Sequence, residues 1–147
     1  MPSSHQFGLS IVLACQAHKD QLDKGGEPYI FHPMHLATKL LPDEDLAAIA
    51  MLHDVIEDSD LTSAKLASYG FSDRVCTAVE LLTHNRKDDY LSVYIKRIAS
   101  NKDATVVKLL DLEHNSDMSR LGVNYEPTPK DLARLAKYTK AIELLQV

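Results

Sequence analysis

The chain has few cysteines, no long apolar run and no excess of basic residues. Cys15 and Cys76 lie far apart and fit no zinc-ligand spacing, so we interpret them as buried, reduced thiols of a cytoplasmic protein. No stretch approaches the roughly 18 apolar residues of a membrane span. Residues 1–6 lack the basic region of a signal peptide. The sequence therefore predicts a cytoplasmic protein without a membrane partner.

The balance of charge also restricts the class of ligand. The formal net charge is −5, whereas broad binding to nucleic acid needs a basic surface. We therefore expect no nucleic-acid partner. A small anionic substrate remains compatible with this charge, because a metal ion and a few lysines can reverse the sign locally.

The apolar residues that are present recur with helical spacing, and no segment alternates cleanly enough to predict a strand. Glycine and proline interrupt the pattern at residues 25–28, at Gly70 and at residues 122–129. We predict an all-α, compact single-domain bundle of about seven or eight helices over residues 1–147. The expected helices cover approximately residues 4–21, 33–40, 42–58, 62–68, 72–82, 88–99, 102–118 and 130–146.

The most informative stretch reads LHDVIED at residues 52–58. Positions i and i+4 of a helix share a face, so we expect His53 over Glu57 and Asp54 over Asp58. Carboxylates this close repel one another unless protons or a cation neutralise them. A divalent metal is the simplest neutralising group, and the stretch therefore predicts a hydrolytic metal site.

Two adjacent helical residues point about 100° apart, so His53 and Asp54 need partners from other segments to enclose an ion. His32 at a helix start and Asp111 in an apolar stretch are the candidate partners. Such a mixed nitrogen and oxygen set suits Mn²⁺, Fe²⁺ or Zn²⁺ better than Ca²⁺. Simpler interpretations stay open, because His32 could cap a helix and Asp111 could pair with Lys108.

Four segments resemble, in order, the motifs of HD-domain hydrolases of the Rel/SpoT type. They are residues 17–33, 50–58, 69–79 and 107–115. Proteins of that family cleave the 3′-diphosphate from the alarmone (p)ppGpp. The resemblance extends over about residues 8–145. Among the members of the family, the sequence resembles the stand-alone small alarmone hydrolases. The resemblance implies the HD-domain fold and leaves no room for a synthetase domain in this sequence.

The resemblance also implies a role for individual residues. The matches to the metal ligands, which normally hold Mn²⁺, are His32, His53, Asp54 and Asp111. Glu57 and Asp58 match the acidic pair that activates or positions the attacking water. Asn115 and Lys24 match residues that contact the nucleotide. From their neighbours in the sequence we expect His18 and His114 to line the pocket or to support the ligands, and we assign His18 to substrate binding.

Two positions depart from the family pattern. Asp23 and Asp117 stand where the family usually has arginine, the side chain best suited to stack on bases and to grip phosphates. These changes weaken the binding of a tetra-anionic nucleotide unless other cations compensate. The candidate cations are Lys19, Lys108, Arg120 and Lys137, and we assign Lys108 to substrate binding.

Our leading hypothesis is a Mn²⁺-dependent phosphohydrolase whose partner is a small-molecule nucleotide, with ppGpp as the best single substrate. One alternative keeps the chemistry and changes the substrate to a nucleoside monophosphate or NADPH. Another is a nucleotide-binding sensor without turnover. The sequence leaves the cellular metal and the oligomeric state open, with a homo-oligomer among the options.

Overall fold

A computed structural model of the chain describes the backbone of residues 2–146 and the side chains of residues 5–146. Within this part the structure is helical, and the one extended pairing is an isolated bridge between Leu22 and Pro28. The α-helices are α1 (Pro2–His18), α2 (Phe31–Leu40), α3 (Glu44–Leu52), α4 (Val55–Asp58), α5 (Ser63–Ser68), α6 (Asp73–Leu82), α7 (Lys96–Ala99), α8 (Lys102–Asn115) and α9 (Pro129–Leu145). A π-helical turn covers Tyr90–Ile95, and a 3-10 turn covers Met118–Leu121. The predicted all-α class is confirmed.

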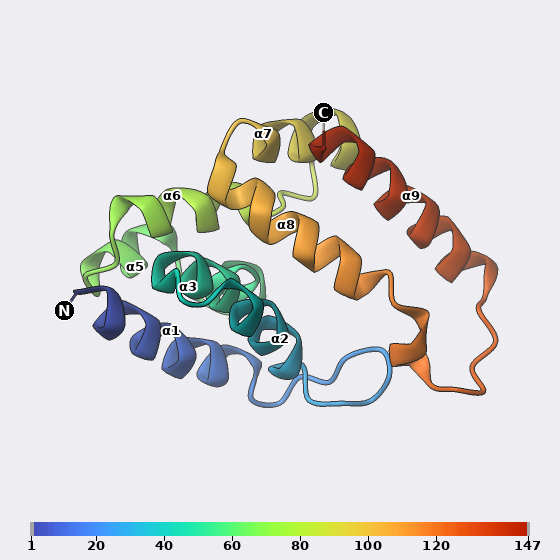
Figure 1. Cartoon of the computed structure of the whole chain (residues 1–147), viewed down its shortest axis with the longest axis horizontal. Helices are drawn as coiled ribbons and strands as arrows, with labels where there is room; N and C mark the ends of the chain where they lie inside the picture. The colour runs from blue at the N-terminus through green and yellow to red at the C-terminus, as the bar shows by residue number, and fades with distance from the viewer. Residues whose placement is uncertain (1, 147) are drawn as a thin grey trace.

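Helix α3 is the central element of the fold. It packs against α1 and α2 and also against α6 and α8, while α9 runs along α8 at the edge of the molecule (Figure 1). Every residue from Ala47 to Leu52 is buried, as expected for a helix that is apolar on all sides. Apolar residues from the surrounding helices join these residues in one hydrophobic cluster. The single-domain assignment of residues 1–147 stays a prediction.

Local sequence explains where several helices begin. The side chains of Ser72, Asn101 and Thr128 each accept a hydrogen bond from a backbone N–H three residues later, and so cap α6, α8 and α9. Thr128 also forms a capping box with Asp131, and Pro129 follows as the first helical residue. The starts expected at Ser72 and near residue 130 are therefore confirmed.

The predicted continuous helix over residues 42–58 is wrong. Helix α3 ends at Leu52 and α4 begins at Val55, because Asp54 leaves the helical region with φ −109° and ψ 1°. The break matters for the site. On an unbroken helix the His53 and Asp54 side chains would diverge, whereas here His53 Nε2 lies 3.1 Å from Asp54 Oδ2.

Four smaller expectations also need correction. Helix α1 ends at His18 rather than near residue 21, and α8 ends at Asn115 rather than near residue 118. Helix α2 begins at Phe31, so His32 lies in its first turn and not before it. Cys15 is exposed, because it lies on the outer side of α1, whereas Cys76 is buried as expected.

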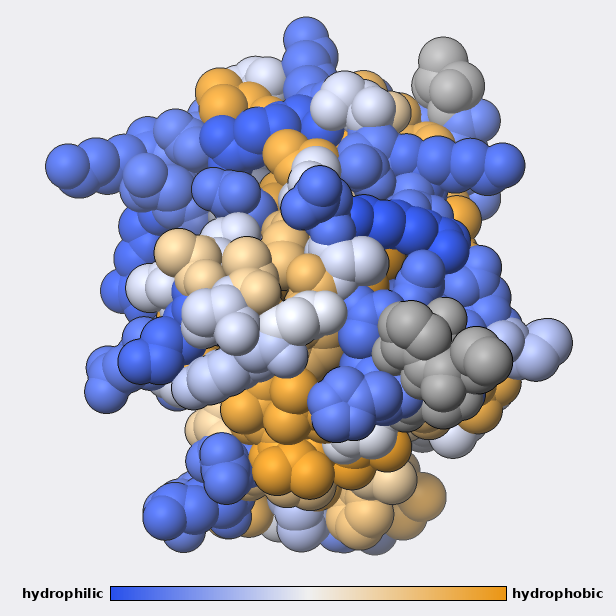
Figure 2. All heavy atoms as spheres, turned by 90° about the vertical axis from the view of Figure 1, so that its left-hand side faces the viewer, coloured by the Kyte–Doolittle hydropathy of each residue, from blue (hydrophilic) through white to orange (hydrophobic). Residues whose placement is uncertain are grey.

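The surface carries both polar and apolar side chains. On the face shown in Figure 2, hydrophilic side chains dominate the periphery and an apolar area lies in the lower half. Among the described residues no helix is long and apolar enough to cross a bilayer. A homo-oligomer stays a prediction.

Candidate metal centre and nucleotide pocket

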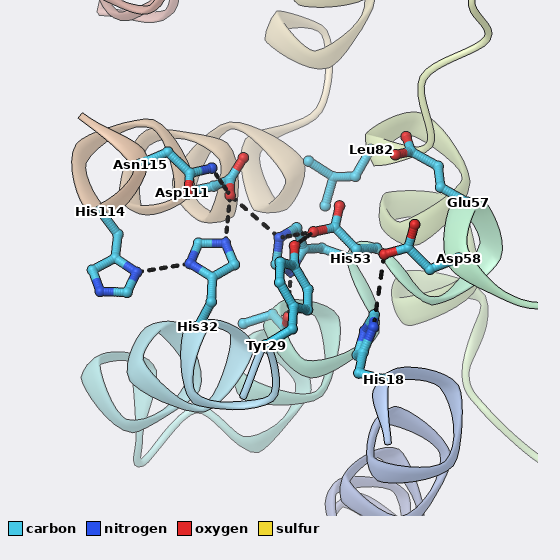
Figure 3. Close-up of polar contacts among 12 residues, drawn as sticks. His18, Tyr29, His32, His53, Glu57, Asp58, Leu82, Asp111, His114 and Asn115 are labelled. Atoms are coloured by element: carbon cyan, nitrogen blue, oxygen red, sulfur yellow. Dashed lines mark hydrogen bonds and ion pairs between the residues drawn. The ribbon is translucent and has the colours of Figure 1, made fainter. Parts of the chain in front are cut away.

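The four predicted metal ligands meet at one point, although they come from different parts of the fold (Figure 3). His32 lies on α2, His53 and Asp54 lie at the break between α3 and α4, and Asp111 lies on α8. Asp111 Oδ1 is 2.8 Å from His32 Nε2 and 3.3 Å from His53 Nε2. One donor atom each from His32, His53 and Asp54 lies within 4.8 Å of the others. The cluster is compact enough to hold one metal ion.

The hydrogen bonds of His53 show why this cluster suits a cation. Nδ1 of His53 lies 2.6 Å from the Ala50 carbonyl oxygen, which can only accept, so Nδ1 carries the proton. Nε2 is buried and has no hydrogen-bond partner among the described residues. When the ring is neutral, the lone pair of Nε2 therefore faces the carboxylates of Asp54 and Asp111. This contact is repulsive unless a positive charge lies between the groups, and a divalent metal fits that requirement.

The same demand for positive charge appears in the titration of His53. Burial alone disfavours the charged ring, but Asp54 and Asp111 outweigh it and raise the pKa of His53 well above its usual value. A proton and a metal ion are thus alternative ways to neutralise the two carboxylates. The metal interpretation of the LHDVIED stretch therefore agrees with the electrostatics of the folded site.

His32 is oriented by His114, a residue expected near the pocket. The two Nδ1 atoms are 2.7 Å apart and the rings are parallel, with centroids 5.0 Å apart. Burial, followed by the nearby Arg120, lowers the pKa of His114 to about 4, so its ring is neutral near pH 7. His114 Nδ1 can then accept the proton of His32 Nδ1, which leaves the lone pair of His32 Nε2 facing the cluster.

Asp111 belongs to the cluster and pairs with Lys108 at the same time. Lys108 Nζ donates to Asp111 Oδ2 at 2.8 Å, and Asn115 Nδ2 donates to Asp111 Oδ1 at 3.0 Å. Burial opposes both charges, but the pair sustains them: Lys108 holds the pKa of Asp111 well below its usual range, and Asp111 raises that of Lys108. The Lys108 ammonium group is thus paired with Asp111, a carboxylate of the candidate metal cluster, and is not free to bind a substrate.

Replacing Lys108 by methionine should therefore destabilise the protein, because Asp111 stays buried without its ammonium partner. We expect the free energy of unfolding to fall by about 3 kcal/mol in urea denaturation at pH 7. Since the pKa of Asp111 is lowered, this difference should persist down to about pH 4 and shrink at lower pH as Asp111 is protonated. Lys140→Met, which breaks the exposed pair with Glu143, is the control and should change stability by less than about 0.5 kcal/mol. Equal stability of the Lys108→Met variant and the wild type would contradict this account.

The two acidic residues of α4 have different surroundings. Glu57 Oε1 accepts the backbone N–H of His84, and its carboxyl group lines a pocket of about 180 Å³ beside Asp54 and Asp111. Burial raises the pKa of Glu57, although the His84 N–H partly offsets the shift. This position suits an acid or base that acts next to the metal cluster.

Asp58 faces the other side of α4. Its Oδ2 accepts a hydrogen bond from Gln21 Nε2 at 3.3 Å and lies 3.7 Å from His18 Nδ1. Burial, together with the charge of Asp54, raises the pKa of Asp58. His18 is almost fully buried and packs on Tyr29 with ring centroids 4.8 Å apart. His18 is not among the residues that line the pockets on either side of the cluster, and its Nδ1 lies 2.9 Å from Gln21 Oε1, so its role in substrate binding stays a prediction.

A larger cavity of about 280 Å³ opens beside the cluster. Its walls are Gln21, Leu22, Asp23, Lys24, Gly25, Tyr29, Asn115, Asp117, Met118, Arg120, Leu121, Arg134 and Tyr138. Lys24 and Asn115, which were expected at the nucleotide, are both among them. The cations Arg120 and Arg134 line the cavity as well, whereas Lys19 and Lys137 do not. The cavity therefore combines cations with aromatic rings, as a pocket for an anionic nucleotide requires.

Sequence reasoning missed three residues that the structure places at the site. Tyr29 donates its hydroxyl hydrogen to Asp54 Oδ2, and burial together with Asp54 raises its pKa, so the phenol stays protonated. Arg134 and Tyr138 reach the cavity from α9. The sequence contains spacings that could have indicated these residues. Tyr29 lies three residues before His32, and residues 134 and 138 share one face of a helix.

Several known proteins are similar to this chain over most of its length. No protein-family model matches the chain. The chain is 35% identical over 129 residues to a guanosine-3′,5′-bis(diphosphate) 3′-pyrophosphohydrolase of Aquifex aeolicus, with 82% of the chain and 18% of that protein covered. It is 35% identical over 143 residues to the protein of the same name from Haemophilus influenzae, covering 89% of the chain and 20% of the relative. A GTP pyrophosphokinase rsh of Brucella melitensis is 36% identical over 128 residues, covering 78% and 17%.

The chain thus spans one fifth or less of the length of these relatives. One solved structure has the same fold, and this chain covers a much larger share of its length. It is described as a metazoan ortholog of SpoT that hydrolyzes ppGpp, and it aligns with a TM-score of 0.79 at 23% identity, covering 96% of this chain and 85% of that one. The matches agree with the ordered motifs and with the clustered histidines and aspartates, and the chain therefore resembles, over most of its length, the HD-domain hydrolases of the Rel/SpoT type.

Proposed function

We propose that this protein is a Mn²⁺-dependent phosphohydrolase that removes the 3′-diphosphate of ppGpp. The observation that carries the proposal is the buried, unpartnered Nε2 of His53, which faces two carboxylates next to a cation-lined cavity. The names of the relatives support ppGpp as the substrate. The mixed nitrogen and oxygen donors support Mn²⁺, although Fe²⁺ and Zn²⁺ suit the same set.

The two cavities match the two parts of such a substrate. The larger cavity and the smaller pocket share Asn115 and Tyr138 on their walls. A nucleotide can therefore place its base and 5′-diphosphate in the larger cavity and its 3′-diphosphate in the smaller pocket, where Glu57 and Asp111 lie. This division explains how one chain can bind the nucleotide and position the scissile phosphate at the same time.

The residues of the smaller pocket supply the proton chemistry. A divalent ion held by His32, His53, Asp54 and Asp111 would act as a Lewis acid for the phosphoryl oxygens and for water. Glu57 accepts the proton of the water that attacks the phosphorus of the 3′-diphosphate. The bond between that phosphorus and O3′ breaks, O3′ gains a proton, and the products are GDP and pyrophosphate. Lys108 and Asn115 keep Asp111 in place during this step.

Product analysis tests the proposal directly. The protein is incubated with ppGpp and Mn²⁺, and we expect stoichiometric GDP and pyrophosphate, with no turnover after EDTA treatment. Release of orthophosphate from a nucleoside monophosphate or NADPH, with ppGpp left intact, would favour the alternative substrate class. Tight binding of ppGpp without product at high concentrations of the metal-loaded protein would instead indicate a sensor.

The cysteines support a reducing compartment. Cys15 and Cys76 both lie in the described part of the chain and are free thiols, and Cys15 is exposed. Exposed free thiols persist where glutathione and thioredoxin keep cysteine reduced. We therefore propose that the protein acts in the cytoplasm.

A further inference from the structure

An ion pair joins two distant segments at the wall of the larger cavity. Arg120 Nη2 lies 3.5 Å from Asp23 Oδ2, and both residues line the cavity. Asp23 belongs to the loop after α1, and Arg120 belongs to the 3-10 turn after α8. The two segments lie side by side in Figure 1. Their backbones are in close contact, because a Cβ atom on Gly25 would lie 2.0 Å from the Arg120 carbonyl oxygen.

The two terminal nitrogens of the Arg120 guanidinium, Nη1 and Nη2, differ in their hydrogen bonds. Nη1 donates to the His114 carbonyl oxygen and to Asn115 Oδ1, both at 3.1 Å. Nη2 has its contact with Asp23 at 3.5 Å, which is long for a charge-assisted hydrogen bond. The guanidinium is therefore anchored at the end of α8 through one nitrogen, and its other nitrogen can exchange partners within the cavity.

Asp23 is fixed independently of Arg120. Its Oδ1 accepts the backbone N–H groups of Gly25 and Glu27, each at 2.9 Å. The side chains of Asp23 and Arg120 are 14% and 21% exposed, so solvent screens their charges only in part. The loop thus holds a carboxylate rigidly beside the cation that an incoming nucleotide anion would use.

We propose that Asp23 competes with the phosphates of the substrate for Arg120, and that this pair sets the affinity of the cavity for anionic nucleotides. The inference rests on the proposed function, which makes the ligand a nucleotide with several phosphates. A phosphate accepts two N–H groups from a guanidinium and binds it more tightly than one long contact does. On binding, Nη2 moves to the phosphate, and the Asp23 charge stays behind and opposes the ligand.

The variant Asp23→Asn isolates this effect. Its side-chain oxygen can still accept both loop N–H groups, while the negative charge beside Arg120 is removed. We expect GDP, which keeps the base and the 5′-diphosphate, to bind the Mn²⁺-loaded protein about three to ten times more tightly in calorimetry. In the Arg120→Ala background the gain should shrink to that of removing one negative charge near the ligand, because Asp23 then has no guanidinium for which to compete. If Asp23→Asn does not fold, Asp23→Ser keeps a hydroxyl acceptor for the loop and replaces it.

Asp117→Asn is the matched control. Asp117 also lines the cavity, but its Oδ1 accepts from the backbone and the hydroxyl group of Ser119, so the control removes the same charge without freeing Arg120. We expect a smaller gain that persists in the Arg120→Ala background. Equal gains from the two variants, no gain from Asp23→Asn, or no binding of GDP by any form would overturn the inference.

The two proposals fail in different ways. Intact ppGpp together with a GDP affinity that depends on Asp23 and Arg120 would reject the proposed function and retain the ion-pair inference. Release of pyrophosphate by the wild type, together with GDP affinity that Asp23→Asn leaves unchanged, would do the reverse. Both measurements use the full chain with Mn²⁺ added.

Discussion

Replacing His53 by alanine is expected to reduce the hydrolysis of ppGpp by about 1,000-fold or more, because the cluster loses a central nitrogen donor. The His53 ring contacts both Asp54 and Asp111, and its Nδ1 is fixed by the Ala50 carbonyl group. Without the His53 ring, Asp54 and Asp111 lose the nitrogen donor that would bind the metal ion together with them. The measurement combines the rate of pyrophosphate release with elemental analysis of bound metal, and both should fall together.

Two further variants make this result interpretable. His53 is buried, so its removal can also destabilise the fold. Asp54→Asn preserves the shape of the side chain and can still accept from Tyr29, and it should likewise lose metal and activity while it remains folded. His5→Ala, at an exposed position on α1, should retain both. Wild-type turnover by folded, metal-loaded His53→Ala protein would show that the centre has been assigned wrongly.

Replacing Glu57 by glutamine is expected to lower kcat by about 100- to 10,000-fold while bound metal is retained. Glutamine can still accept the His84 N–H, but it cannot take a proton from water. Because burial raises the pKa of Glu57, the fall in kcat on acidification should occur at a higher pH than the ordinary glutamate value of about 4.3. The base is active when deprotonated, so kcat rises with pH through this range.

The pH profile separates catalysis by Glu57 from a structural role. In Glu57→Gln the residual kcat should no longer fall on acidification over the pH range in which Glu57 is protonated in the wild type; this fall is the acid limb of the pH profile. Glu113→Gln removes an exposed glutamate on α8 and should keep both the wild-type rate and the limb. If Glu57→Gln shows an unchanged kcat, Glu57 does not accept the proton, and Asp58 becomes the next residue to test.

Much of the fold could be predicted from short-range patterns. Helical spacing of apolar residues gave the all-α class, and capping residues such as Ser72 and Thr128 gave helix starts, because both effects act within a few residues. The helix ends were less accurate. The break at His53 and Asp54 escaped prediction because no glycine or proline marks it, and both residues are compatible with a helix.

The candidate site was predictable in part. The residue types and the ordered motifs predicted four metal ligands together with Glu57, Lys24 and Asn115. The structure places His32, His53, Asp54 and Asp111 in one cluster, and Glu57, Lys24 and Asn115 on the walls of two adjoining pockets. The pairing of Lys108 with Asp111 was one of the alternatives that the sequence left open, and the position of His18 was not predictable, because both depend on packing. Lys108 pairs with Asp111 inside the core, and His18 lies beneath Tyr29 beside Asp58.

The sequence by itself determined the helical class, the set of residues proposed to bind the metal, and the departure of Asp23 and Asp117 from arginine. Periodicity, capping and side-chain chemistry are local properties, so they can be identified from the amino-acid sequence alone. Only the tertiary structure decided which charges meet. Asp23 and Arg120 are 97 residues apart in the chain, and their contact exists because two loops pack against each other beside the cavity. Charge pairing between distant segments follows from packing, and for that reason the effect of Asp23 on nucleotide binding became visible only in the folded protein.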